Sequence, residues 1–224
     1  KTIAIINEIK KSTEKHNKHL FKTNITELRE LYPSPIDFTN ILIPHINYIM
    51  TQDENNEHHH FYLQVLLENG FDINVEIKSS YNKRIYTIGN ILLAYDYSAS
   101  TYLEILSKYP MNPNAEEKIY NSLTNSLRVS RPALYIIIDL LYEKEQSKET
   151  ITEIVTLLLK SGANLAIPAK IFDENKKITS ISSPLYVAIE NNAPLEILNL
   201  ILDHKTNNPD YEKMKLYAVQ IDDI

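Results

Sequence analysis

The chain has 224 residues, of which 43% are hydrophobic, and this is enough to bury a core of globular size. Its formal net charge of -6 gives no basic field for a phosphate backbone, so we expect no nucleic acid partner. The absence of cysteine excludes disulfides, thiolate nucleophiles and cysteine-ligated zinc. The longest apolar run, residues 132–142, includes Asp139 and is far shorter than the ~20 residues of a membrane span.

Residues 1–36 are predicted to form an N-terminal helical cap. Asn24 and Glu27 have the spacing of a helix start, and Leu28 and Leu31 follow before a proline-containing end at residues 32–35. A basic run lies upstream, and it is interpreted either as a solvated helix or lead-in, or as a basic docking patch. The run consists of Lys10, Lys11, Lys15, Lys18 and Lys22, with His16 and His19.

Two of the three glycines occupy the same place in a repeated phrase. Residues 66–74 and 158–166 each contain two leucines, two polar residues, a glycine and an apolar residue. This order predicts a helix end with Gly70 or Gly162 in the left-handed C′ position, which a side chain disfavours. Similar helix ends are predicted near Leu106 and Leu202. The two glycine phrases therefore indicate a repeated helical unit.

Helix openings recur upstream of these ends, at residues 39–42, 89–94, 132–135 and 183–188. At the last of them Ser183 is predicted to cap the helix and Pro184 to occupy its first turn. Each unit is thus predicted to be a short helix, a turn, a longer helix and a polar loop, which must stack on its neighbours to bury a core. Asn114 and Glu117 form a capping-box pattern, which predicts an extra helix near residues 115–128. Residues 211–220 are expected to be the first helix of a further unit.

The sequence resembles the ankyrin-repeat family in two motifs. The family's S/T-P-L-x-x-A opening is matched by Ser183, Pro184, Leu185 and Ala188. Its helix ending is matched by Ile154, Val155, Leu158, Leu159, Gly162, Ala163, Asn164 and Leu165. Tyr135 and Tyr186 depart from the pattern, because ankyrin repeats usually have histidine there. The resemblance implies an all-α fold over residues 37–224, an irregular ankyrin-like solenoid of about four helical hairpins and a partial fifth. A HEAT-type array is the alternative solenoid, but its repeats do not need the Gly-Ala-Asn ending.

No motif in the sequence indicates catalysis. The glycines are isolated, which excludes a phosphate-cradling loop and a nucleophile elbow, so no cofactor, catalytic residue or enzyme activity is predicted. The run His58, His59 and His60 is interpreted as a solvated loop or helix start, because successive helical side chains point about 100° apart. A metal or pH-sensing role is the alternative interpretation, and no metal site is predicted.

The expected function is a protein–protein interaction scaffold, whose partner is another protein and not a small molecule. The alternative is a substrate-recruiting part of a larger enzyme whose catalytic region lies outside this chain. The resemblance, with the Ile-, Asn- and Lys-rich composition, implies a host-interaction protein of an intracellular bacterium or large virus, located inside a host cell. The candidate partner-binding residues are Tyr81, Lys83, Arg84 and Tyr86 on one loop, and Lys176 and Lys177 on another.

Overall fold

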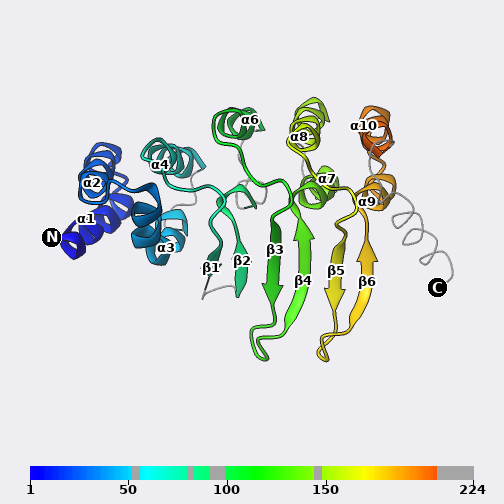
Figure 1. The fold of residues 1–224 in the computed structure, drawn as a ribbon, viewed down its shortest axis with the longest axis horizontal. Coiled ribbons are helices and arrows are strands. Elements are labelled where there is room, and N and C mark those ends of the chain that lie inside the picture. The colour runs from blue at the N-terminus through cyan, green and yellow to red at the C-terminus, as the bar shows by residue number, and fades with distance from the viewer. Residues whose placement is uncertain (52–55, 80–82, 91–98, 144–147, 206–224) are drawn as a thin grey trace. The chain divides into compact units, whose positions relative to one another are not determined.

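A computed structural model describes residues 1–51, 56–79, 83–90, 99–143 and 148–205. The chain divides into two compact units, Lys1–Ile77 and Lys78–Ile224. The first consists of four described helices, and the second combines helices with a sheet (Figure 1). The predicted helix at residues 211–220 and most of the predicted opening at 89–94 lie outside the described residues.

The first unit is a helical bundle with an aliphatic and aromatic core. Its helices are α1 (Thr2–Glu14), α2 (Lys18–Leu31), α3 (Pro35–Thr51) and α4 (Asn56–Glu68). Ile9, Phe21, Leu42 and Tyr62, one from each helix, are fully buried. The rings of Phe21 and Tyr62 lie 4.5 Å apart between α2 and α4. Periodic apolar residues therefore bring the four helices together around one core.

The turn between α1 and α2 differs from the sequence prediction. The helix was expected to start at Asn24, but it starts at Lys18, and Asn24 is buried inside it. Asn17 is the actual cap, because its side chain accepts a hydrogen bond from the N–H of Leu20 at 3.0 Å. The end at Leu31 is as predicted.

The second unit alternates strand pairs and helices. Its strands are β1 (Ile77–Ser79, starting at the unit boundary), β2 (Arg84–Tyr86), β3 (Glu116–Tyr120), β4 (Leu127–Pro132), β5 (Ala169–Phe172) and β6 (Ile178–Ser182). Its helices are α6 (Ala99–Lys108), α7 (Ala133–Glu143), α8 (Lys148–Lys160), α9 (Pro184–Glu190) and α10 (Leu195–Lys205). Figure 1 shows α6, α8 and α10 in a row farthest from the strands, with α7 and α9 between that row and the sheet.

The prediction of an all-α solenoid is wrong, because the chain contains a six-stranded sheet in the order β1-β2-β3-β4-β5-β6. The strand pairs β2–β3, β3–β4, β4–β5 and β5–β6 are antiparallel. The protein is therefore mixed α and β. The segments interpreted as polar loops between repeats are hairpins, and their strands pair from one hairpin to the next.

The extra helix predicted near residues 115–128 is also wrong, because these residues form β3, a tip and the start of β4. The side chain of Asn114 does not cap a helix. Its Oδ1 accepts the N–H of Asn164 at 2.7 Å, and its Nδ2 donates to the carbonyl of Gly162 at 3.0 Å. Asn114 thus links its own turn to the turn that follows α8, so the apparent cap serves a contact between distant segments.

The two glycine helix ends are confirmed. Gly70 and Gly162 have φ of +87° and +91°. Gly70 donates its N–H to the carbonyl of Leu67, and Gly162 donates its N–H to that of Leu159. At each helix end, the residue after the glycine donates its N–H to the carbonyl five residues earlier, that of Leu66 or Leu158. This pair of bonds defines a Schellman motif. The predicted cap of α9 is confirmed as well, because Ser183 accepts the N–H of Tyr186 and Pro184 follows it.

The same type of turn follows the helices α4, α6 and α8. At Asp72, Asn112 and Asn164, the side-chain oxygen accepts the N–H two residues later at 2.9 to 3.0 Å. The carbonyl of the same residue accepts the N–H three residues later. An acidic or amide side chain at this position favours such a turn, which sends the chain from a helix into the hairpin that follows.

Candidate interaction surface on the hairpin sheet

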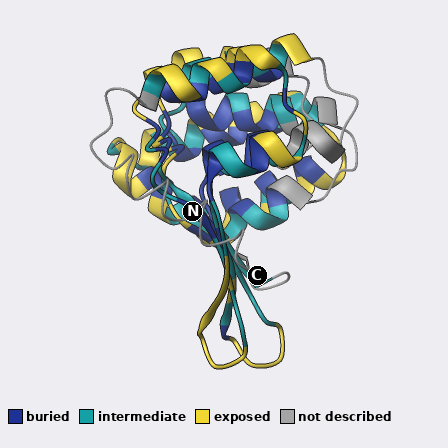
Figure 2. Ribbon diagram, turned by 90° about the vertical axis from the view of Figure 1, so that its right-hand side faces the viewer, coloured by how far each residue is buried: buried dark blue, intermediate teal, exposed yellow. Residues whose placement is uncertain are grey.

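The hairpins of the second unit extend away from its helices. α7 packs against the base of β4, and no described helix of this unit covers the outer ends of β3–β6 (Figure 1). Figure 2 shows the sheet edge-on, with the strands changing from buried near the helices to exposed at the tips. We use the name tip surface for residues 119–129 and 171–180, the outer parts of the β3–β4 and β5–β6 hairpins.

One face of the sheet carries a row of side chains from five strands. The register pairs are Arg84 with Ile119, Ile119 with Val129, Val129 with Ile171, and Ile171 with Ser180. Directly opposed residues share a face, so these five side chains form one row. Its centre is aliphatic, and Ile171 is 47% exposed. The row therefore places aliphatic side chains between an arginine and a serine.

The other face carries a row that contains two lysines. Ile85 pairs with Lys118, Lys118 with Ser130, Ser130 with Lys170, and Lys170 with Ile181. Lysine therefore occupies the same place in β3 and in β5. The two rows differ in charge, because one contains two lysines and the other a single arginine.

A buried carboxylate stabilises the base of the sheet. Glu117 is 3% exposed, and its Oε2 accepts a hydrogen bond from the Nε of Arg131 at 2.9 Å. Arg84 Nη1 lies 3.4 Å from the other oxygen of Glu117, and Arg131 Nη1 lies 3.6 Å from Asp139 Oδ2. Burial of a charge is costly unless it is paired, and Glu117 is paired with two guanidinium groups. These ion pairs join β2, β3, β4 and α7.

Tyr135 lies beside this cluster on α7. Burial raises the pKa of its phenol, and the negative charge of Asp139 raises it further. The phenol consequently stays protonated at neutral pH and acts as a neutral polar group. Tyr135 occupies one of the two places where the sequence departs from the ankyrin pattern.

The β5–β6 tip is closed by Asp173. Its N–H donates to the carbonyl of Lys177 at 2.9 Å, and its Oδ1 accepts the N–H groups of Asn175 and Lys177 at 2.9 and 2.8 Å. Lys176 has a φ of +63°, which is typical of a three-residue hairpin loop. The side chains of Lys176 and Lys177 are exposed. Asp173 therefore holds the loop that presents both lysines.

The β3–β4 tip has a comparable closure. Asn121 donates its N–H to the carbonyl of Ser126 at 2.9 Å, and its Oδ1 accepts the N–H of Leu123 at 2.8 Å. Leu123 is 92% exposed at the end of this tip. A leucine so far from any core is a candidate anchor for a partner, because burying it releases apolar area from water.

A shallow pocket of about 390 Å³ lies between the two tips. It is lined by Asn121, Ser126, Leu127, Arg128, Phe172, Asp173 and Glu174. Polar and apolar residues both line it, and both signs of charge are present. This composition suits a side chain of a protein partner better than it suits one small molecule, because the pocket opens along the tip surface.

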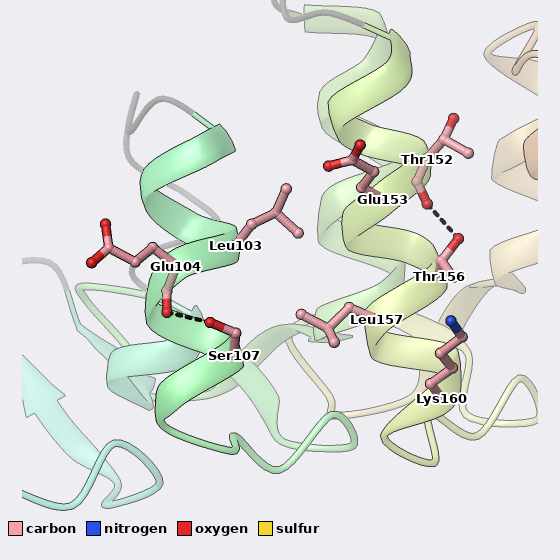
Figure 3. A pocket seen from close by; sticks show the side chains of 8 residues that line it. All are labelled: Leu103, Glu104, Ser107, Thr152, Glu153, Thr156, Leu157 and Lys160. Carbon is pink, nitrogen blue, oxygen red and sulfur yellow. Dashed lines mark hydrogen bonds between the residues drawn. The ribbon is translucent and has the colours of Figure 1, made fainter.

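A second hollow of about 560 Å³ lies between α6 and α8 (Figure 3). Leu103 and Leu157 point toward each other across it, and Glu153 lies at its edge. Its hydroxyl groups bond within their own helices: Ser107 donates to the carbonyl of Glu104, and Thr156 to that of Thr152. These hydroxyls satisfy helix carbonyls and indicate no chemistry.

The structure separates the predicted site residues. Lys176 and Lys177 lie at the β5–β6 tip, whereas Lys83 and Arg84 lie on the β1–β2 hairpin, and β3 and β4 separate the two hairpins. The carbonyl of Lys83 accepts the N–H of Tyr120 at 2.9 Å, and Arg84 is bound to Glu117. Tyr86 is 9% exposed, so its ring belongs to the core. Tyr81 lies outside the described residues.

The sequence interpretation missed the β3–β4 tip, including Leu123 and Arg128, because a helix was predicted there. A signal was present in residues 127–130, where apolar and polar residues alternate with the period of a strand. The Asn- and Thr-containing residues 121–125 are typical of a turn.

The histidine run lies in α4 of the first unit. The ring of His58 stacks on that of His16 at 4.8 Å. Among the described residues, no group of three potential metal ligands converges. Within the same residues, no helix combines the length and apolar character needed to cross a bilayer.

Comparison with known proteins assigns no family. No protein-family model matches the chain, and no curated protein matches it.

Proposed function

We propose that this chain binds another protein through its tip surface. The observation that carries the proposal is the exposure of Leu123, Ile171 and Ile178 at 92%, 47% and 42% on hairpins that no described helix of the second unit covers. Aliphatic side chains surrounded by charged and amide groups are typical of a protein interface. The resemblance to ankyrin repeats agrees with the proposal, because members of that family bind proteins.

The hydrogen bonds within the two tips support this proposal. Asp173 and Asn121 each accept backbone N–H groups within their own loops, so the exposed side chains start from ordered turns. A partner then does not have to supply the free energy of ordering these loops, which preserves affinity. Leu123, Lys176 and Lys177 are the residues expected to contact the partner.

The test is site-specific capture. A photo-crosslinking residue placed at Leu123 is expected to trap the partner, whereas the same residue at Leu195, which is 70% exposed on α10, is not. Leu123→Glu combined with Lys177→Glu should lower partner recovery about tenfold, as expected for an interface anchor. Leu195→Glu is the matched control. Equal capture from both positions, or unchanged recovery by a folded double variant, would refute the tip surface.

A further inference from the structure

The pairing of one hairpin with the next shows how a strand can be added to the edge of this sheet. β2 pairs with β3, and β4 pairs with β5, so the second strand of one hairpin binds the first strand of the next. β6 is the second strand of the last described hairpin, and among the described residues it is the edge strand of the sheet. An edge strand presents unpaired N–H and C=O groups that an extended segment can bind.

β6 and β4 occupy equivalent positions. Within their hairpins, Val129 of β4 opposes Ile119, and Ser180 of β6 opposes Ile171. Both hairpins also contain a register irregularity near the tip, which leaves Arg128 of β4 and Thr179 of β6 as the extra residue. β4 nevertheless binds β5 through Val129 and Ser130. The irregularity in β6 is therefore compatible with an added strand at Ser180 and Ile181.

The sequence of β6 does not protect the edge. Residues 178–182 contain no charged residue and no proline, and residues 178–180 are exposed. Natural edge strands usually avoid pairing by means of charged residues or proline. β6 lacks both.

The strands that pair with a preceding hairpin, β3 and β5, share one sequence pattern. β3 contains Lys118, Ile119 and Tyr120, and β5 contains Lys170, Ile171 and Phe172, so each reads lysine, isoleucine, aromatic residue. In β5, the isoleucine opposes Val129 and the lysine opposes Ser130. The same register on β6 places isoleucine opposite Ser180 and lysine opposite Ile181.

We propose that β6 binds an extended segment of a partner protein, antiparallel, with the pattern lysine, aliphatic residue, aromatic residue. The proposal rests on the proposed function, since it names the chemistry of a partner segment at the edge of the same sheet. The partner strand continues the sheet by one strand beside the β5–β6 tip. Its backbone supplies affinity, and its lysine and aliphatic side chains lie on opposite faces.

The experiment titrates the isotope-labelled chain with two peptides and follows amide shifts by NMR. One peptide has the sequence of residues 168–173, and the other carries Glu in place of the lysine. On an Ile181→Glu chain, the lysine peptide should bind about two- to fivefold more tightly than the glutamate peptide, and on Ile181→Lys the order should reverse. Because each ratio is measured on one variant, a change in folding cancels. The largest shifts are expected at residues 180–182.

Three results would overturn the proposal. The first is that the same peptide binds more tightly to both Ile181 variants, or that the amide shifts lie outside residues 180–182. The second is binding only after Leu216→Asp, since Lys215, Leu216 and Tyr217 of this chain have the same pattern and would then be the occupant. The third is a dimer that the peptide dissociates, which would assign β6 to a second copy. The titration shares no variant with the capture at Leu123, so either experiment can fail alone.

Discussion

At the scale of single residues, side-chain oxygens determine where this chain turns. Asn114 binds two backbone groups of the turn after α8, and Asp173 binds two N–H groups of its own loop. Glycine is used in the same way at Gly70 and Gly162, where the backbone is left-handed. Asn192 supplies this conformation after α9, with a φ of +50°. Asparagine tolerates it better than most residues do.

Gly162 provides a direct test of the helix end. A Cβ added there meets no atom within 4 Å, so the cost of Gly162→Ala comes from the backbone conformation and not from a clash. We expect Gly162→Ala to lower the free energy of unfolding by about 1 kcal/mol and Gly162→Asn by less. Urea unfolding of both variants measures this. An alanine variant as stable as the asparagine variant would contradict the explanation.

His45 on α3 should make stability depend on pH. Burial lowers its pKa below 6.5, and the charge of Lys10 lowers it further. At a pH between the pKa of His45 in the folded chain and its pKa of about 6.5 in the unfolded chain, the unfolded chain binds more protons. The stability associated with neutral His45 is therefore fully present above about pH 6.5 and is lost as the pH falls through the folded-state pKa. His45→Gln should reduce the loss of stability between pH 7.5 and 5, measured by urea unfolding. His19→Gln, at an exposed position, is the control and should retain the loss.

At the scale of elements, the hairpins join the second unit's helices through one buried charge cluster. Glu117 lies between Arg84 and Arg131, and Arg131 also reaches Asp139 on α7. Removing one partner of a buried ion pair leaves the other uncompensated. The cluster thus couples the orientation of three strands to a helix.

Glu117→Gln is expected to destabilise the chain by about 1–3 kcal/mol, because the two arginines lose their carboxylate while hydrogen bonding is partly retained. Chemical unfolding monitored by circular dichroism measures the change. Glu116→Gln is the matched control, since Glu116 is the adjacent, partly exposed residue of the same strand, and it should cost little. A similar loss in both variants would mean that the cluster adds no stability.

At the scale of the whole molecule, the sequence predicted helices better than strands. The helices α8 and α9 follow from apolar spacing and from local signals such as Ser183 and Gly162. The strands are short and lie between turn residues, and the pattern at Asn114 indicated a helix because its real partners are 48 and 50 residues away. The loop with Lys176 was predicted, but Arg84 lies in β2 and not on a loop, and the row from Arg84 to Ser180 depends on strand register, which no single segment encodes.

Hydrogen exchange across the chain should separate the tips from the core. Residues 121–126 and 173–177 are expected to exchange first, because only local hydrogen bonds hold them, and the buried face of α8 last. Mass spectrometry after increasing exposure to heavy water measures the order. Tips as slow as α8 would contradict the exposed arrangement, and a bound partner should slow the tips alone.

One side chain, Asn121 or Asp173, closes each hairpin tip, and this allows the sequence of the tips to vary. Asn121 and Asp173 complete their loops without using any group from the helices. Insertions or substitutions between Asn121 and Ser126 would therefore leave the helical core and its stability largely untouched. Under the proposed function, recognition and folding are encoded by separate residues, so the tips of this chain are free to diverge, or to be redesigned, toward a new target.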